Sequence, residues 1–208
     1  MDYVRDPRAI YEQSFATIRR EADLSRFGED EEALAVRLIH ACGMVDIASD
    51  LVVSPGAVLA GRQALTAGLP VICDTRMVAE GIVRRILPGA SEVFCAVSDA
   101  ETRVLAEATG QTRSAAAIER LRDNLGNAII AIGNAPTALF RLLEGLDEGW
   151  PKPAVILGFP VGFVGAAESK AELVANSRGV PFIALKGRRG GSALAAAAVN
   201  ALAGGLSI

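Results

Sequence analysis

The chain is poor in the residues that build metal centres and disulfide frameworks. Its 208 residues include one histidine and three cysteines. Cys42, Cys73 and Cys95 are widely spaced, and no two of them form a CxxC pair. The sequence therefore predicts no disulfide framework and no metal site. We expect all three cysteines to be core residues.

Strong charge and long apolar segments are also missing. The formal net charge is −3 and the sequence has no basic stripe, so nucleic-acid binding is not expected. Proline, glycines or Asn200 interrupt the apolar stretches 154–167 and 193–206, and both fall short of the ~20 residues of a membrane span. Residues 1–6 mix charges without an apolar segment, which argues against a secretory signal and predicts a cytoplasmic protein.

Neither common nucleotide fingerprint is present. The glycines of 159–165 lack the G-x-G-x-x-G order, and 165–170 is not G-x-x-x-x-G-K-[ST]. A nucleotide-dependent α/β enzyme is therefore the least favoured class. A thermal-shift screen with nucleotides tests this class.

Apolar runs alternate with helical segments along the chain. Apolar residues make up 51 % of the sequence, enough for one domain over residues 1–208. The runs are nearly continuous, as in parallel strands covered on both faces, and predict a three-layer α/β/α sandwich with a mainly parallel sheet. The predicted strands are 50–54, 71–74, 92–97, 128–133, 154–159 and 181–186. Two helices precede them, 7–26 and 31–47, with Asp30 as the N-cap of the second.

The loops that follow the strands collect glycines, cations and hydroxyls. Ligands of open parallel sheets bind at this edge. Arg188 and Arg189 in 186–192 precede a helix, where they and the backbone N–H groups form an anion site or, alternatively, a solvated turn. Phe163 and Val164 lie between glycines, facing a flat apolar ligand or a neighbouring chain, or forming a structural turn. Thr112 or Ser114 caps a helix, leaving Arg113 to reach an anion.

His40 is the only histidine in the sequence, and its position allows two interpretations. Its helical neighbours Val36, Gly43, Met44 and Ile47 form an apolar stripe, which is typical of a core histidine. The alternative is a general acid or base, because the imidazole pKa lies near neutrality. Periodicity does not choose between them.

Read in order, several motifs resemble the precorrin-8X methylmutase (precorrin isomerase) family almost from end to end. The resemblance rests on Ile10-Tyr11-Glu12-Gln13-Ser14-Phe15, Ile39-His40-Ala41-Cys42-Gly43, Cys73-Asp74, Thr112-Arg113-Ser114, the segment Ala131-Ile132-Gly133-Asn134-Ala135-Pro136-Thr137, Pro160-Val161-Gly162-Phe163-Val164-Gly165 with Glu168-Ser169-Lys170, and Gly187-Arg188-Arg189-Gly190-Gly191-Ser192.

This resemblance implies a flavodoxin-like homodimer that consumes no cofactor. The implied reaction is an acid-assisted 1,5-sigmatropic methyl shift from C-11 to C-12 of precorrin-8X, giving hydrogenobyrinic acid in cobalamin biosynthesis. Substrate and product are the expected partners. The family's catalytic histidine falls on His40, which makes it the expected acid. The expected substrate-binding residues are Ser14, Asp74, Thr75, Arg76, Arg113, Asn134, Pro136, Thr137, Gly162, Phe163, Val164, Lys170, Arg188 and Arg189.

Two alternatives to this function stay open. One is the equivalent isomerase acting on cobalt-precorrin-8 in the anaerobic pathway. The other is a non-catalytic tetrapyrrole carrier, for which a missing histidine would have been the signature. The presence of His40 argues against the carrier.

Overall fold

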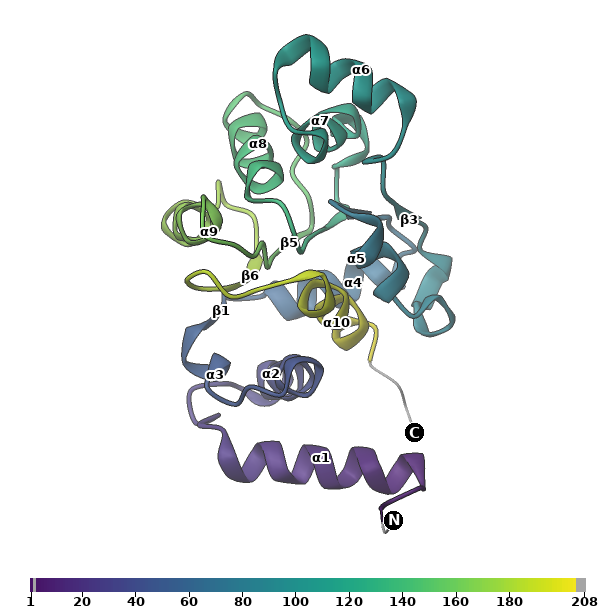
Figure 1. The fold of residues 1–208 in the computed structure, drawn as a ribbon, viewed down its shortest axis with the longest axis vertical. Coiled ribbons are helices and arrows are strands. Elements are labelled where there is room, and N and C mark those ends of the chain that lie inside the picture. Colours follow the sequence, from purple (N-terminus) through teal and green to yellow (C-terminus); the bar gives the residue numbers. More distant parts are fainter. Residues whose placement is uncertain (2, 205–208) are drawn as a thin grey trace.

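A six-stranded sheet forms the centre of the computed structural model, which describes residues 1 and 3–204 (Figure 1). The strand order is β1-β6-β5-β4-β2-β3, and every neighbouring pair is parallel except β1 with β6. All six predicted strands are present, and the mainly parallel sheet is confirmed. Their bounds are β1 Leu51–Val53, β2 Val71–Cys73, β3 Val93–Phe94, β4 Ile129–Ile132, β5 Val155–Gly158 and β6 Phe182–Leu185.

The order of the five parallel strands is that of a flavodoxin-like fold. Counted from the β3 edge, the parallel strands lie in the order β3-β2-β4-β5-β6. Numbered by their order in the chain, this is 2-1-3-4-5, which is the doubly wound pattern. Strand β1 extends this sheet at the β6 edge. The chain changes direction of winding at β2, which pairs with β3 on one side and β4 on the other. This switch point is where such folds usually bind ligands.

Helices cover both faces of the sheet, as a three-layer sandwich requires (Figure 1). The first face carries α2 (Glu29–Cys42), α4 (Ala57–Thr66), α5 (Arg76–Gly81) and α10 (Ser192–Leu202). The second carries α7 (Arg113–Arg120), α8 (Pro136–Asp147) and α9 (Ala166–Ala175). Helix α1 (Pro7–Glu21) lies outside α2, and α6 (Ala100–Thr109) lies outside α7. The short elements are α3 (Ile47–Asp50), η1 (Arg84–Ile86), η2 (Pro88–Ala90) and η3 (Arg122–Asn124).

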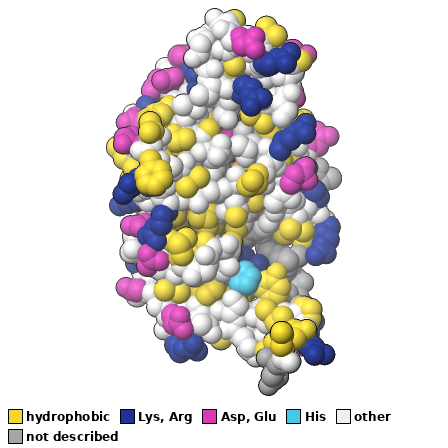
Figure 2. Space-filling model, viewed as in Figure 1, with side chains coloured by type: hydrophobic (Ala, Val, Ile, Leu, Met, Phe, Trp, Pro, Cys, Tyr) yellow, Lys and Arg dark blue, Asp and Glu magenta, His cyan; other side chains and the backbone are white. Residues whose placement is uncertain are grey.

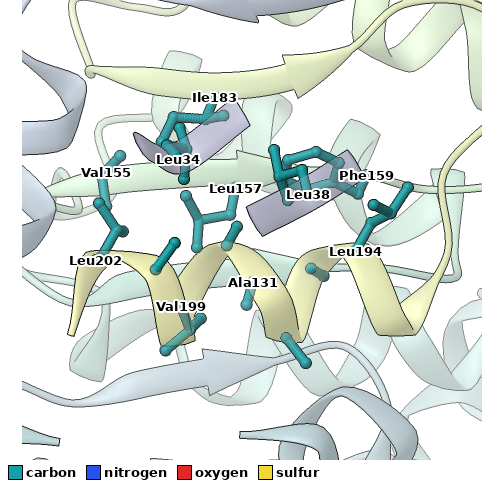
Figure 3. Packing of buried hydrophobic residues seen from close by; sticks show 14 of the residues in the cluster. Leu34, Leu38, Ala131, Val155, Leu157, Phe159, Ile183, Leu194, Val199 and Leu202 are labelled. Carbon is teal, nitrogen blue, oxygen red and sulfur yellow. The ribbon is translucent and has the colours of Figure 1, made fainter. Parts of the chain in front are cut away.

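The two faces of the sheet pack into two separate apolar cores. In β4, Ile129 and Ala131 join the first core and Ile130 and Ile132 join the second. In the first core Leu38 of α2 and Leu194 of α10 lie close to the sheet (Figure 3). This packing fixes α2, and therefore His40, relative to the strands.

Three local predictions need correction. The N-cap of α2 is Gly28 and not Asp30, because the acidic residues 29–32 fit the first helical turn and Glu31 accepts a hydrogen bond from the Gly28 N–H. Helix α1 ends at Glu21 and not at residue 26. Helix α2 ends at Cys42 and not at residue 47, because Gly43 adopts a left-handed conformation that ends it. Of the cysteines, which are all unpaired, Cys73 is buried but Cys42 and Cys95 are partly exposed, so only one is a core residue.

Among the described residues, no helix has both the length and the apolar character to cross a membrane.

Candidate active site

His40 lies in the last turn of α2 and faces three side chains of α1. The Ser14 Oγ is 2.8 Å from the His40 Nδ1. The rings of Tyr11 and Phe15 have their centroids 5.1 and 5.3 Å from the imidazole. Because Ser14 and Phe15 lie three and four residues after Tyr11, the three side chains share one face of α1. Two aromatic rings and one hydroxyl therefore orient the imidazole.

The local sequence explains why the two helices meet at this point. The Asp6 carboxylate caps α1 by accepting from the Arg8 N–H, and Pro7 occupies the first helical position. Gly43 adopts a left-handed conformation with φ 71° and ends α2 three residues after His40. An ion pair of 3.0 Å between Arg19 and Glu32 links the two helices further along.

His40 is exposed and borders two hollows, so it is not a core histidine in this structure. Figure 2 shows the imidazole at the surface with hydrophobic side chains around it. The larger hollow, about 470 Å³, lies between α1 and α2. The smaller, about 120 Å³, is lined by Tyr11, Arg37, His40, Ala41, Val83, Ala197 and Asn200.

Partial burial lowers the pKa of His40, and the nearby Arg37 guanidinium lowers it further. The neutral imidazole therefore predominates at pH 7. In the neutral ring the Ser14 hydroxyl can donate to Nδ1, which leaves the proton on Nε2. In the protonated ring Nδ1–H can donate to the Ser14 Oγ. The same serine can therefore hydrogen-bond the imidazole in both of its protonation states.

Asp74 occupies the switch point between β2 and β4. Its carboxylate oxygens accept hydrogen bonds of 3.0, 2.9 and 2.7 Å from the N–H groups of Gly133, Asn134 and Ala135. Its side chain is fully buried. Burial raises the pKa of Asp74, and the three N–H donors oppose that effect. Asp74 was expected to contact the substrate; in this structure its carboxylate faces the backbone of the β4–α8 loop.

The remaining expected residues near the switch point belong to helix starts. Thr75 caps α5 and its hydroxyl lies 3.4 Å from that of Ser192. Thr112, and not Ser114, caps α7; these were the two residues expected for the cap. The Thr112 hydroxyl lies 2.7 Å from that of Thr137. Exposed or partly exposed side chains at these starts are Arg76, Arg113, Asn134, Pro136 and Thr137.

The loops after β5 and β6 pack against each other. The Gly162 N–H donates to the Arg188 carbonyl, and the Arg188 guanidinium lies 5.3 Å from the centroid of the Phe163 ring. Phe163 and Val164 are 86 % and 88 % exposed. A Cβ on Gly190 would come within 2.3 Å of the Phe159 carbonyl oxygen, so glycine allows this close approach.

Arg189 and Lys170 serve as internal ties in this structure. The Arg189 guanidinium pairs with Asp46 and, at 2.7 Å, with Asp50, which fastens the β6–α10 loop to α3. The buried Lys170 ammonium donates to the Arg189 carbonyl. Burial lowers the pKa of Lys170 to about 8. Both cations were expected to contact substrate, but the contacts seen here are with the protein itself.

The expected site residues form separate groups. Of the expected residues, only Ser14 joins His40 in lining the two hollows. Most of the others lie in the loops after β2, β4, β5 and β6, whereas Arg113 begins α7 after α6 and Lys170 lies within α9. Sequence reasoning assigned no role to Tyr11, Phe15 or Arg37, which surround the imidazole. The spacing of Tyr11, Ser14 and Phe15 on one helical face was the available signal for two of them.

Solved structures and sequence relatives agree on the class of this protein. A crystal structure titled as a precorrin-8x methyl mutase from Thermus thermophilus matches with a TM-score of 0.85 and 38 % identity, covering 94 % of each chain. The curated relatives include precorrin-8X methylmutases of Pseudomonas aeruginosa (63 % identical, 98 % of each chain) and of a Sinorhizobium species (58 % identical, 97 % of this chain and 96 % of the relative). The class is therefore an isomerase on a flavodoxin-like fold.

A family model described as precorrin-8X methylmutase matches residues 9–204. The chain belongs to the precorrin-8X methylmutase family. A relative named cobalt-precorrin-8 methylmutase, from Salmonella typhimurium, is 38 % identical over 97 % of both chains.

Proposed function

We propose that this chain moves the C-11 methyl group of precorrin-8X to C-12, giving hydrogenobyrinic acid, with His40 as the general acid. The observation that supports this most directly is the His40–Ser14 pair at the border of two hollows. An exposed imidazole whose Nδ1 has a hydroxyl partner can hold and release a proton without rearranging its surroundings.

The reaction is an isomerisation, so its atoms balance within one molecule. The bond between the methyl carbon and C-11 breaks while the bond to C-12 forms. A proton given by His40 makes the conjugated ring more electron-poor and lowers the barrier to migration, and it returns to the imidazole when the product forms. General acid catalysis of this kind contributes about 10²–10⁴-fold.

The substrate is a flat macrocycle with acetate and propionate side chains, so its site needs both apolar surface and cations. Arg113 and Arg188 are the exposed arginines that we propose as carboxylate anchors, with Arg76 as a further candidate. We propose Ser14, Thr75, Asn134, Pro136, Thr137, Gly162, Phe163 and Val164 as further contacts. Arg189, Lys170 and Asp74 would support these loops from behind.

Turnover and binding of a His40→Asn variant test this function. We expect the variant to bind hydrogenobyrinic acid yet lose turnover of precorrin-8X, because the amide fills similar space without supplying a proton. Near-normal turnover would remove His40 from the mechanism. A wild-type chain that binds tetrapyrrole but never converts it would be a carrier instead.

The substrate in vivo is proposed to be the metal-free precorrin-8X. Two relatives above 50 % identity carry that name, whereas a relative named cobalt-precorrin-8 methylmutase is 38 % identical. Parallel assays with precorrin-8X and cobalt-precorrin-8 decide between them. A higher kcat/KM for the cobalt substrate would reverse the assignment.

We also propose that residues 1–208 act as one domain in a cytoplasmic homodimer. Val161, Phe163 and Val164 support an interface, because they are exposed apolar side chains close together in one loop, and exposed apolar patches mark interaction sites. Sedimentation equilibrium of the wild type and of Val164→Asp tests this. A monomeric wild type would contradict it.

A further inference from the structure

Helix α10 carries one polar residue inside an otherwise apolar run. Between Ser192 at its start and Leu202 at its end, the helix consists of alanines, Leu194, Val199 and Asn200. Asparagine is a poor helix former, because its amide competes for backbone hydrogen bonds. A place for it in this helix therefore calls for partners of the amide outside α10.

The Asn200 amide makes two hydrogen bonds to one neighbouring segment. Its Oδ1 accepts from the Val83 N–H at 2.9 Å, and its Nδ2 donates to the Gly81 carbonyl at 3.0 Å. Helix α5 ends at Gly81, and the last carbonyls of a helix lack partners within it. A Cβ on Gly81 would lie 2.7 Å from the Ala196 Cβ, so the end of α5 packs tightly on α10. Asn200 therefore completes the end of α5 from another element.

The segment held in this way borders the hollow beside His40. Val83 and Asn200 line the 120 Å³ hollow together with Tyr11 of α1 and His40 of α2. Ile82, between the two bonded residues, is buried in the first core. The two hydrogen bonds and this core contact together fix where Val83 lies relative to the imidazole.

We propose that Asn200 is a positioning residue for the methyl shift: its amide fixes segment 81–83, and with it the wall that Val83 forms in the hollow beside His40. This inference rests on the proposed function. Both polar ends of the amide are bonded to the backbone, so Asn200 acts through Val83. A fixed wall limits the poses of a macrocycle bound at His40, and a misplacement of about 1 Å can lower a rate about 100-fold.

Kinetics of Asn200→Ala test this role against a matched control. Asn176→Ala removes another amide that accepts from a backbone N–H, that of Arg178, at the end of α9 on the second face of the sheet. Both variants should melt below the wild type. At temperatures well below both transitions, we expect kcat for precorrin-8X to fall about tenfold or more in Asn200→Ala and to match the wild type in Asn176→Ala. Equal kcat values in the two variants would overturn the inference.

A double-mutant cycle tests whether Asn200 acts through Val83. Val83→Ala removes most of the side chain that forms the wall. The further fall in kcat caused by Asn200→Ala should therefore be smaller in the Val83→Ala background than in the wild type. Two independent effects, whose factors simply multiply, would contradict the proposed route.

Asn200→Asp keeps the test decisive if Asn200→Ala does not fold. Its carboxylate still accepts from the Val83 N–H but cannot donate to the Gly81 carbonyl, so kcat should fall less than in Asn200→Ala. A wild-type kcat in Asn200→Asp would overturn the inference.

The same variant gives a readout that does not depend on turnover. The sequence has one histidine, so an NMR titration reports the pKa of His40 alone. A carboxylate in the same hollow should raise this pKa, and an unchanged pKa would contradict the placement of Asn200 beside His40. A wild-type chain that does not convert precorrin-8X would count against the proposed function, whereas the titration would still test the placement.

Discussion

Removing one oxygen atom tests how the imidazole of His40, the proposed acid, is held. Ser14→Ala deletes the Oγ that lies 2.8 Å from the His40 Nδ1 and leaves the α-helix intact. Because His40 is exposed, water can take the place of the hydroxyl. The net loss is therefore that of one solvent-accessible hydrogen bond, about 1 kcal/mol. If the whole amount is lost in the transition state, kcat/KM falls about fivefold.

The assay is the spectrophotometric conversion of precorrin-8X under kcat/KM conditions. Ser14→Thr keeps a hydroxyl at the same position and should lose less than Ser14→Ala. Thr109→Ala removes an exposed hydroxyl from α6 and should match the wild type. The loss should stay modest because the rings of Tyr11 and Phe15 still pack against the imidazole.

Two results would refute this reasoning. A loss beyond about a hundredfold would mean that the serine hydroxyl takes part in proton transfer itself. An unchanged kcat/KM would mean that the hydrogen bond does not help to position the imidazole. In either case the role given to Ser14 would be wrong.

Three further predictions follow from buried or titrating groups. Asp74→Ala should lower the free energy of unfolding by at least about 3 kcal/mol in urea titrations, because three N–H groups lose their acceptor; Asp74→Asn should cost less, since its amide oxygen still accepts. Burial lowers the pKa of Lys170 from 10.5 to about 8, so between those values the folded chain binds fewer protons than the unfolded chain. Wild-type stability, measured against Lys170→Met, should therefore rise with pH over that interval. Finally, kcat/KM should fall as pH rises through the pKa of free His40, with a midpoint below 6.5; a midpoint well above that value would contradict the lowered pKa.

The fold was largely readable from the sequence because buried parallel strands are continuously apolar. Strands β4, β5 and β6 each have four residues, all of them buried, and each of these apolar runs was predicted as a strand. The antiparallel direction of β1 was not predicted, since β1 pairs with a strand more than 120 residues later in the chain. The N-cap of α2 was misplaced because acidic residues suit both a cap and a first turn.

The site was less predictable, because it depends on contacts between helices and not on a local pattern. The apolar neighbours of His40 along α2 suggested a core position, yet α1 provides Ser14 at its side and leaves the imidazole exposed. Periodicity left two interpretations of His40 open, and the choice of His40 as the proposed acid came from the resemblance to the family. Arg37 belongs to no motif that the sequence singled out. The fold places it in the hollow beside His40.

The position of Asp74 explains why the proposed acid lies on a helix and not at the usual ligand site of the fold. In a doubly wound sheet, ligands bind where the winding reverses, and backbone N–H groups there bind anions. Here the three N–H groups after β4 are already bonded to a buried carboxylate of the protein. A substrate carboxylate would have to displace Asp74 to use them. An acidic macrocycle therefore has to find its proton donor elsewhere, and the proposed acid, His40, lies where α2 meets α1.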